Sequence, residues 1–170
     1  GLSSPHIAEQ LKRSKGVKRV EIKRERFTAV NNDCVDETRK MPSDSVGLIH
    51  TSIPFSNHYE YTPSYNDFGH NATTAQFFKQ MDYLTPELLR VLQPGRVCAV
   101  HVKDRVLFGN VTGTGFPTVE PFHAMCISHY TKHGFQYFGM ITVCTDVVRE
   151  NNQTYRLGWT EQCKDGTKMG

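Results

Sequence analysis

The sequence predicts an α/β protein built on a doubly wound, mostly parallel sheet with helices on both faces. Three observations predict it. Apolar runs typical of strands alternate with stretches of helical spacing, so the strands are joined by helical crossovers. The run at residues 45–52 is continuously apolar, as expected of a strand covered on both faces. Polar groups follow the strands at residues 27–33 and 45–52, where ligands bind in such sheets.

Each element has its own signal along the chain. A short helix is expected at 6–15, and a helix at 34–40 ends at Pro42. The main helix is expected from Thr74, as its cap, with a dent or break at Pro86. The remaining expectations are a long polar loop at 56–72, a strand at 96–102, a glycine-rich loop at 104–117, a helix at 118–133 and a fourth strand or hairpin arm at 135–146.

Length and composition indicate the size of the domain and the compartment in which the protein works. At 170 residues, the chain can form one domain with a core that needs no disulfide or metal. Five widely spaced cysteines without a C-x-x-C pair predict free thiols in a reducing compartment, and no apolar run is long enough to span a bilayer. We therefore expect a cytoplasmic protein without a membrane partner.

The positive charge is concentrated at the beginning of the chain. Residues 1–26 hold eight Lys or Arg against three Glu, whereas residues 27–170 carry twelve basic and fourteen acidic residues. This divides the sequence into a basic segment, 1–26, and a main domain, 27–170. The segment either contacts a polyanion such as DNA or forms a solvated face. The candidate contacts are Lys12, Arg13, Lys18 and Arg19.

The strand at 45–52 opens directly into the run Ser52-Ile53-Pro54-Phe55. Pro54 fixes its own φ and restricts Ile53, so the turn is stiff. A stiff turn can hold a hydroxyl and a carbonyl oxygen beside an aromatic ring, which suits a planar base that carries an amino group. Taken alone, the run also fits an ordinary turn with a buried Phe.

The surrounding sequence resembles a known family. The stretches "NNDCVDETRKMPSDSVGLIHTSIPF" and "FFKQMDYLTPELLRVLQPGRVCAVHV" are similar to the DNA methyltransferases that act on N4 of cytosine or N6 of adenine. The resemblance covers residues 27 to 145 and implies a Rossmann-like methyltransferase fold, S-adenosyl-L-methionine as cofactor and DNA as partner. The resemblance is specific because the flanking pattern agrees, not because of the tetrapeptide.

The resemblance implies a role for each position of the tetrapeptide. Ser52 and the carbonyl of Ile53 would accept hydrogen bonds from the target amino group, Pro54 would stiffen the turn, and Phe55 would stack on the flipped base. Ser52 would also border the cofactor. A serine at this place favours cytosine N4 over adenine N6. No covalent intermediate is needed, so the cysteines have no part in the mechanism.

Two departures from the family pattern stand out. Ile53 replaces the first proline of the motif, although its carbonyl remains. The cofactor motif F-x-G-x-G is missing, and the pair Gly113 and Gly115 follows a polar loop instead of a strand. The sequence fits a permuted branch of the family, cut before its cofactor half. Asp33 would then contact the adenine side of the cofactor, or it caps the next helix.

Other side chains are weaker candidates. Lys103 and Arg105 follow a strand and contact DNA or form a solvated turn. In the loop at 56–72, the aromatic groups predicted to stack on bases or separate strands are His58, Tyr59, Tyr61 and Tyr65. The series His123, Cys126, His129 and His133 has ligand-like spacing, but the ligands would come from a single helix, so we expect no metal.

The favoured function is thus a site-specific DNA methyltransferase, with a restriction endonuclease as an open question. The alternative from another class is a nucleic-acid-binding domain or partner subunit of the same fold that has lost catalysis. An unrelated binding domain with a doubly wound sheet is a third reading. The sequence does not indicate an oligomeric state or a recognition sequence.

Overall fold

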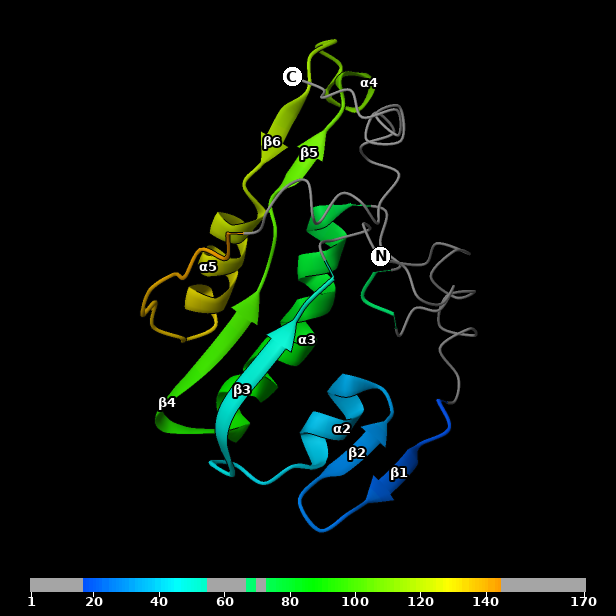
Figure 1. Cartoon of the computed structure of the whole chain (residues 1–170), viewed down its shortest axis with the longest axis vertical. Coiled ribbons are helices and arrows are strands. Elements are labelled where there is room, and N and C mark those ends of the chain that lie inside the picture. Colours follow the sequence, from blue (N-terminus) through cyan, green and yellow to red (C-terminus); the bar gives the residue numbers. More distant parts are fainter. Residues whose placement is uncertain (1–16, 55–66, 70–72, 145–170) are drawn as a thin grey trace, which may run out of the picture. The chain divides into compact units, whose positions relative to one another are not determined.

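The structure, a computed structural model, describes residues 17–54, 67–69 and 73–144 (Figure 1). The chain divides into two units, residues 1–137 and 138–170. The described part of the second unit, 138–144, contains no helix or strand. The elements of the described residues lie in the first unit: β1 (Val20–Lys23), β2 (Thr28–Asn31), α2 (Cys34–Lys40), β3 (Val46–Ser52), α3 (Thr74–Val91), β4 (Leu92–His101), β5 (Arg105–Leu107), α4 (Gly109–Thr112), β6 (Thr118–Glu120) and α5 (Phe122–Lys132).

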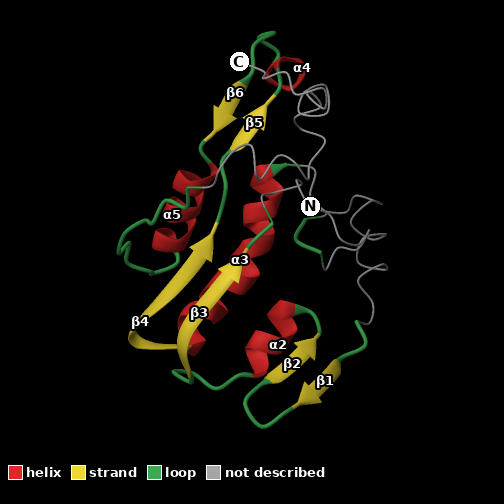
Figure 2. Ribbon diagram, in the orientation of Figure 1, coloured by secondary structure: helices red, strands yellow, loops and turns green. Residues whose placement is uncertain are grey.

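The strands form three two-stranded sheets among the described residues (Figure 2). The β3–β4 pair is parallel, with Ile49 opposite Cys98 and Ser52 opposite His101. The β1–β2 and β5–β6 pairs are antiparallel hairpins. The expected parallel, helix-connected arrangement is therefore present in β3–α3–β4, but the described residues do not form one doubly wound sheet.

The helices cover one face of the β3–β4 pair. The core cluster includes Phe77 and Met81 of α3 and Phe122 of α5, and Cys98 and Val100 of β4 pack against it. All three of these helix residues have no exposed surface. Burying side chains of this size contributes about 1.5–3 kcal/mol each. This packing fixes the face of the sheet that points inward.

The other face of the β3–β4 pair is exposed, contrary to the prediction from the apolar run at 45–52. Leu48 and Val97 lie opposite each other and are 60% and 47% exposed, and His50 is also exposed. Continuous apolarity was therefore a poor guide here, because strand geometry alternates the side chains and the described helices pack on one side only.

Two features of α3 also differ from the prediction. The side chain of Thr73 caps α3 by accepting from Gln76 N, whereas Thr74 is buried and donates to Glu120. Helix α3 continues through Pro86. One missing hydrogen bond does not end it, because both halves of the helix are held by buried residues.

The region after β4 is also more ordered than predicted. Strand β5 and helix α4 lie within the expected loop, and strand β6 occupies the expected start of the next helix, so that α5 begins at Phe122 instead of 118. Gly109 lies so close to Gly115 that a Cβ atom would be 2.4 Å from the Gly115 carbonyl group. This close approach closes the hairpin. The fourth strand expected at 135–146 is absent from the described residues 135–144.

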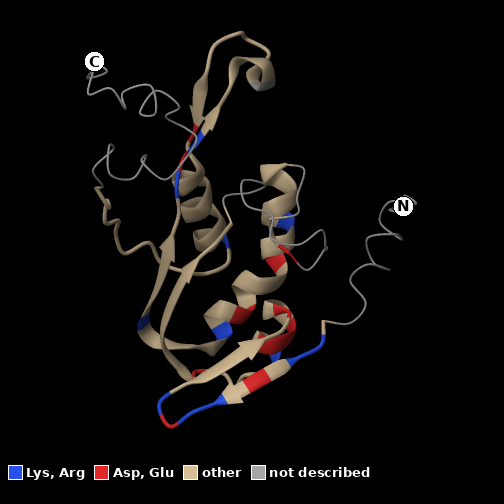
Figure 3. Ribbon diagram, turned by 45° about the vertical axis from the view of Figure 1, so that its right-hand side comes forward, with Lys and Arg blue, Asp and Glu red and all other residues tan. Residues whose placement is uncertain are grey.

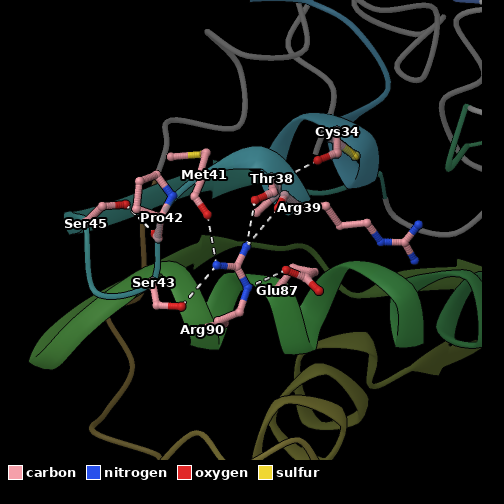
Figure 4. Close-up of polar contacts among 9 residues, drawn as sticks. All are labelled: Cys34, Thr38, Arg39, Met41, Pro42, Ser43, Ser45, Glu87 and Arg90. Atoms are coloured by element: carbon pink, nitrogen blue, oxygen red, sulfur yellow. Dashed lines mark hydrogen bonds and ion pairs between the residues drawn. The ribbon is translucent and has the colours of Figure 1, made fainter.

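Arg90 joins α3 to the end of α2 (Figure 4). Its Nη1 donates to Met41 O at 2.8 Å and its Nη2 to Thr38 O at 3.0 Å, while Nε pairs with Glu87 at 2.7 Å. The last carbonyls of a helix have no partner within the helix and carry partial negative charge. A guanidinium from a neighbouring helix therefore caps α2 and fixes its position relative to α3.

Candidate active site at the end of β3

The predicted catalytic run lies at the carboxyl end of β3, where the chain leaves the sheet. Ser52 is exposed, whereas the side chain of Ile53 is 6% exposed and belongs to the core cluster. Pro54 follows in a half-buried position. Burial of Ile53 anchors the turn in the core and leaves the Ser52 hydroxyl on the solvent side. Phe55 lies outside the described residues, as do His58, Tyr59, Tyr61 and Tyr65.

His101 is a neighbour of Ser52 that the sequence did not reveal. It ends β4 directly opposite Ser52, and its Nδ1 lies 3.4 Å from Ser52 Oγ. Both side chains are exposed. The contact depends on the strand register, so sequence spacing alone could not have found it. It allows the imidazole to orient the hydroxyl.

Asp33 caps α2, as one of its two predicted roles requires. Its Oδ1 accepts from Val35 N at 2.8 Å and from Asp36 N at 3.1 Å. A carboxylate at this place also complements the positive end of the helix dipole. Capping of α2 is therefore a sufficient structural reason for an aspartate at position 33. The predicted contact with a cofactor remains a prediction.

Arg105 has an intramolecular role. Its Nη1 lies 3.1 Å from Thr74 Oγ1 and 3.4 Å from Glu120 Oε2, and its side chain is only 16% exposed. The guanidinium therefore ties β5 to β6 and to the start of α3, which argues against the predicted DNA contact. Lys103 is exposed.

Asp104, between these two residues, holds the beginning of α5. Its Oδ1 accepts from His123 N at 3.0 Å, and both carboxylate oxygens lie within 2.8 Å of His123 Nδ1. Burial alone would raise the pKa of Asp104, but the hydrogen bonds from His123 lower it. His123 is thus an orienting partner of Asp104 and does not share the contacts of His129 and His133.

The charged residues of the basic segment that are described lie on and around the β1–β2 hairpin (Figure 3). Arg19 forms a forked pair with Glu37, with both N–O distances at 2.8 Å, and a further ion pair with Glu21. These hydrogen bonds lower the pKa of Glu37 to about 2. Arg19 therefore links the hairpin to α2. Lys18 is exposed, and its contact with DNA remains a prediction. Lys12 and Arg13 lie outside the described residues.

The four described cysteines, Cys34, Cys98, Cys126 and Cys144, are free thiols. Burial raises the pKa of Cys126 to about 12 and that of Cys98 to about 11. The thiolate is the nucleophilic form of cysteine, so these two side chains are poor nucleophiles near neutral pH. No helix in the described ranges is long and apolar enough to cross a bilayer.

No family model matches the chain, and no curated protein matches it. Among solved structures, the chain is similar to a Thermus thermophilus protein described as a DNA modification methylase, crystallised with S-adenosyl-L-methionine. The match has 28% sequence identity and a TM-score of 0.47, and covers 61% of this chain and 39% of that protein. A TM-score below 0.5 does not establish a shared fold, so the likeness by itself assigns neither fold nor activity.

Proposed function

We propose that the chain is the catalytic half of an S-adenosyl-L-methionine-dependent DNA methyltransferase that modifies an exocyclic amino group. The observation that carries the proposal is the end of β3, where an exposed serine hydroxyl is followed by a buried isoleucine and a proline. The sequence resemblance over residues 27 to 145 also supports the proposal. The parallel β3–β4 pair supports it, because ligands in parallel α/β sheets bind at the carboxyl ends of the strands.

The chemistry follows from two hydrogen-bond acceptors. Ser52 Oγ and the Ile53 carbonyl oxygen would accept the two N–H bonds of the target amino group. These bonds draw the protons toward oxygen and reduce delocalisation of the nitrogen lone pair into the base, so the nitrogen becomes a better nucleophile. Ile53 suits this role despite replacing proline, because its buried side chain holds the peptide group in place.

His101 would act as a positioning residue for Ser52. A hydroxyl that donates its proton to His101 Nδ1 keeps both lone pairs for the amino group. The base itself must leave the DNA stack to reach this turn, and Phe55, His58, Tyr59 and Tyr61 are the proposed stacking groups. Serine at the first place of the motif favours cytosine N4 over adenine N6 as the target.

The described residues do not by themselves complete a cofactor site. S-adenosyl-L-methionine would supply an electrophilic methyl group, and Asp33 and Ser52 are the candidate contacts. Asp33, however, also caps α2, and no glycine-rich turn directly follows a parallel strand in the described ranges.

DNA would be bound through the exposed basic residues near the β1–β2 hairpin and after β4. Contacts with phosphates dominate nonspecific affinity and position the protein on the duplex. The proposed contacts among the described residues are Lys18, Lys23, Arg24, Arg26 and Lys103. We also propose a cytoplasmic location and a companion restriction endonuclease.

The direct test is to identify the methylated base. The complete reading frame that encodes the chain is expressed in a host without DNA methylation, and the DNA is digested to nucleosides and analysed by mass spectrometry. N4-methylcytosine is the expected product, and a matched Ser52→Ala strain should lack it. N6-methyladenine would keep the mechanism but overturn the inference from Ser52 about the base. Well-expressed, folded protein without either product would reject the enzyme and favour the nucleic-acid-binding alternative.

A further inference from the structure

A cluster of potential metal ligands lies between α3 and α5, separate from the end of β3. Asp82 belongs to α3, His129 to α5, and His133 is the residue that caps the end of α5. One ligand atom from each of the three lies within 4.8 Å of the other two. The sequence argument against a metal was that all ligands would come from one helix. Asp82 removes that objection, because it comes from a second element 47 residues before His129 in the chain.

The separations in the cluster match those of a coordination shell. Ligand atoms about 2.0–2.1 Å from a tetrahedral zinc ion lie about 3.3 Å from one another. Asp82 Oδ1 lies 2.7 Å from His133 Nε2 and 3.8 Å from His129 Nδ1. The contact between Asp82 and His133 has the length of a good hydrogen bond, whereas the distance between Asp82 and His129 is too long for one. Shifts of about half an ångström in side-chain position would bring both to the coordination value.

The side chain of His129 is already oriented for ligation. It is 6% exposed, its Nε2 lies 2.9 Å from Thr85 Oγ1, and its ring packs against Phe78 with centroids 5.0 Å apart. When Nε2–H donates to Thr85, the lone pair of Nδ1 faces Asp82. Metal-binding histidines commonly donate their other N–H to a fixed oxygen in this way.

Access to the cluster comes from the Asp82 side. The side chain of Asp82 is 39% exposed and that of His133 is 16% exposed. Lys132 Nζ lies 3.7 Å from Asp82 Oδ1, but the Lys132 side chain is 70% exposed and free to turn toward solvent. A divalent ion can therefore enter by displacing this ammonium group.

We propose that Asp82, His129 and His133 form a binding site for a divalent transition-metal ion of the zinc class, which clamps α3 to α5. Two imidazole nitrogens and one carboxylate oxygen suit zinc, cobalt and nickel, whereas calcium and magnesium prefer oxygen ligands alone. Three protein ligands leave the fourth position to water on the exposed side. The metal joins two helices that carry the core behind β4, so its binding stabilises the fold.

The test uses the purified 170-residue chain after treatment with EDTA and removal of the chelator. Co²⁺ is the spectroscopic probe, because tetrahedral cobalt absorbs strongly in the visible range and a thiolate ligand adds a charge-transfer band in the near ultraviolet. Zn²⁺ is then added to displace it. We expect one Co²⁺ per chain with a dissociation constant in the micromolar range or below, a tetrahedral spectrum without a thiolate band, displacement by Zn²⁺, and a higher melting temperature with zinc.

Variants assign the binding to these residues. Asp82→Asn and His133→Gln should each weaken metal binding by at least about tenfold. The control His50→Gln removes an exposed histidine of β3 and should bind as the original chain does. Far-ultraviolet circular dichroism without metal checks folding, and the near-isosteric Asp82→Asn provides the test if His133→Gln is unstable. Absence of binding, a thiolate band, or equal affinity in a folded Asp82→Asn variant would overturn the proposal.

Discussion

Replacement of Arg90 by alanine tests how α2 is held to the rest of the molecule. The change removes the hydrogen bonds from Arg90 to the carbonyls of Thr38 and Met41, together with the ion pair to Glu87. It also removes the positive charge from the end of α2. The Met41 carbonyl is then left to water, whereas the Thr38 carbonyl keeps only its hydrogen bond from Met41 N.

The expected loss of stability is about 2 kcal/mol. A hydrogen bond to a charged group contributes about 1.5–3 kcal/mol, and two bonds at the lower end of this range give about 3 kcal/mol. Because the Arg90 side chain is 33% exposed, water replaces part of this interaction, which lowers the value. For a chain of this length, the melting temperature should fall by about 4 to 8 °C.

Urea unfolding monitored by circular dichroism measures the effect, and hydrogen exchange of the α2 amides locates it. Arg96→Ala is the matched control, because Arg96 is exposed on β4, and it should change stability by less than about 0.5 kcal/mol. Arg90→Lys should recover less than half of the loss, because an ammonium group cannot reproduce the guanidinium fork. Equal stability of the Arg90→Ala and Arg96→Ala variants would refute the capping role.

Three further predictions concern the proposed site and the hairpin. In the complete enzyme, Ser52→Ala should lower turnover far more than DNA affinity; an equal loss of both in single-turnover and binding assays would argue against the amino-acceptor role. Calorimetry on the isolated 170 residues should detect weak or no binding of S-adenosyl-L-methionine, and tight binding would contradict our view of the cofactor site. Because the hydrogen bonds from Arg19 lower the pKa of Glu37 from 4.5 to about 2, the stability that Glu37 contributes is present above about pH 4.5 and is lost as the pH falls toward 2. Glu37→Gln should therefore destabilise the chain at pH 7 and flatten its acid unfolding curve over that range, whereas the exposed Glu25→Gln should leave the curve unchanged.

Local signals predicted several elements well. The short helix was expected at 34–40, and α2 spans Cys34–Lys40. Three signals in this segment favour a helix: an aspartate at the N-cap, acidic residues in the first turn and basic residues in the last turn. Each signal acts over only a few residues. The same reasoning placed the strand that becomes β2, the strand that becomes β3 and the long helix that becomes α3.

Predictions that depended on distant contacts were less successful. The apolar run at 45–52 suggested burial on both faces, yet Leu48 is exposed because the described helices pack against one side. Thr74 has the chemistry of a cap, but its hydroxyl is used by Glu120, 46 residues later in the chain. The glycine-rich segment after β4 was expected to be a loop, although part of it pairs into a hairpin.

The sequence by itself determined the alternation of strands and helices around β3, the serine and proline at the end of that strand, and the basic character of the first 26 residues. These features depend on residue chemistry and short-range spacing. Only the tertiary structure decided that His101 lies beside Ser52, that Arg90 caps α2, and that Asp82 meets His129 and His133. Each of these contacts joins residues about 50 positions apart, because strand register and helix packing set such contacts and sequence spacing does not encode them.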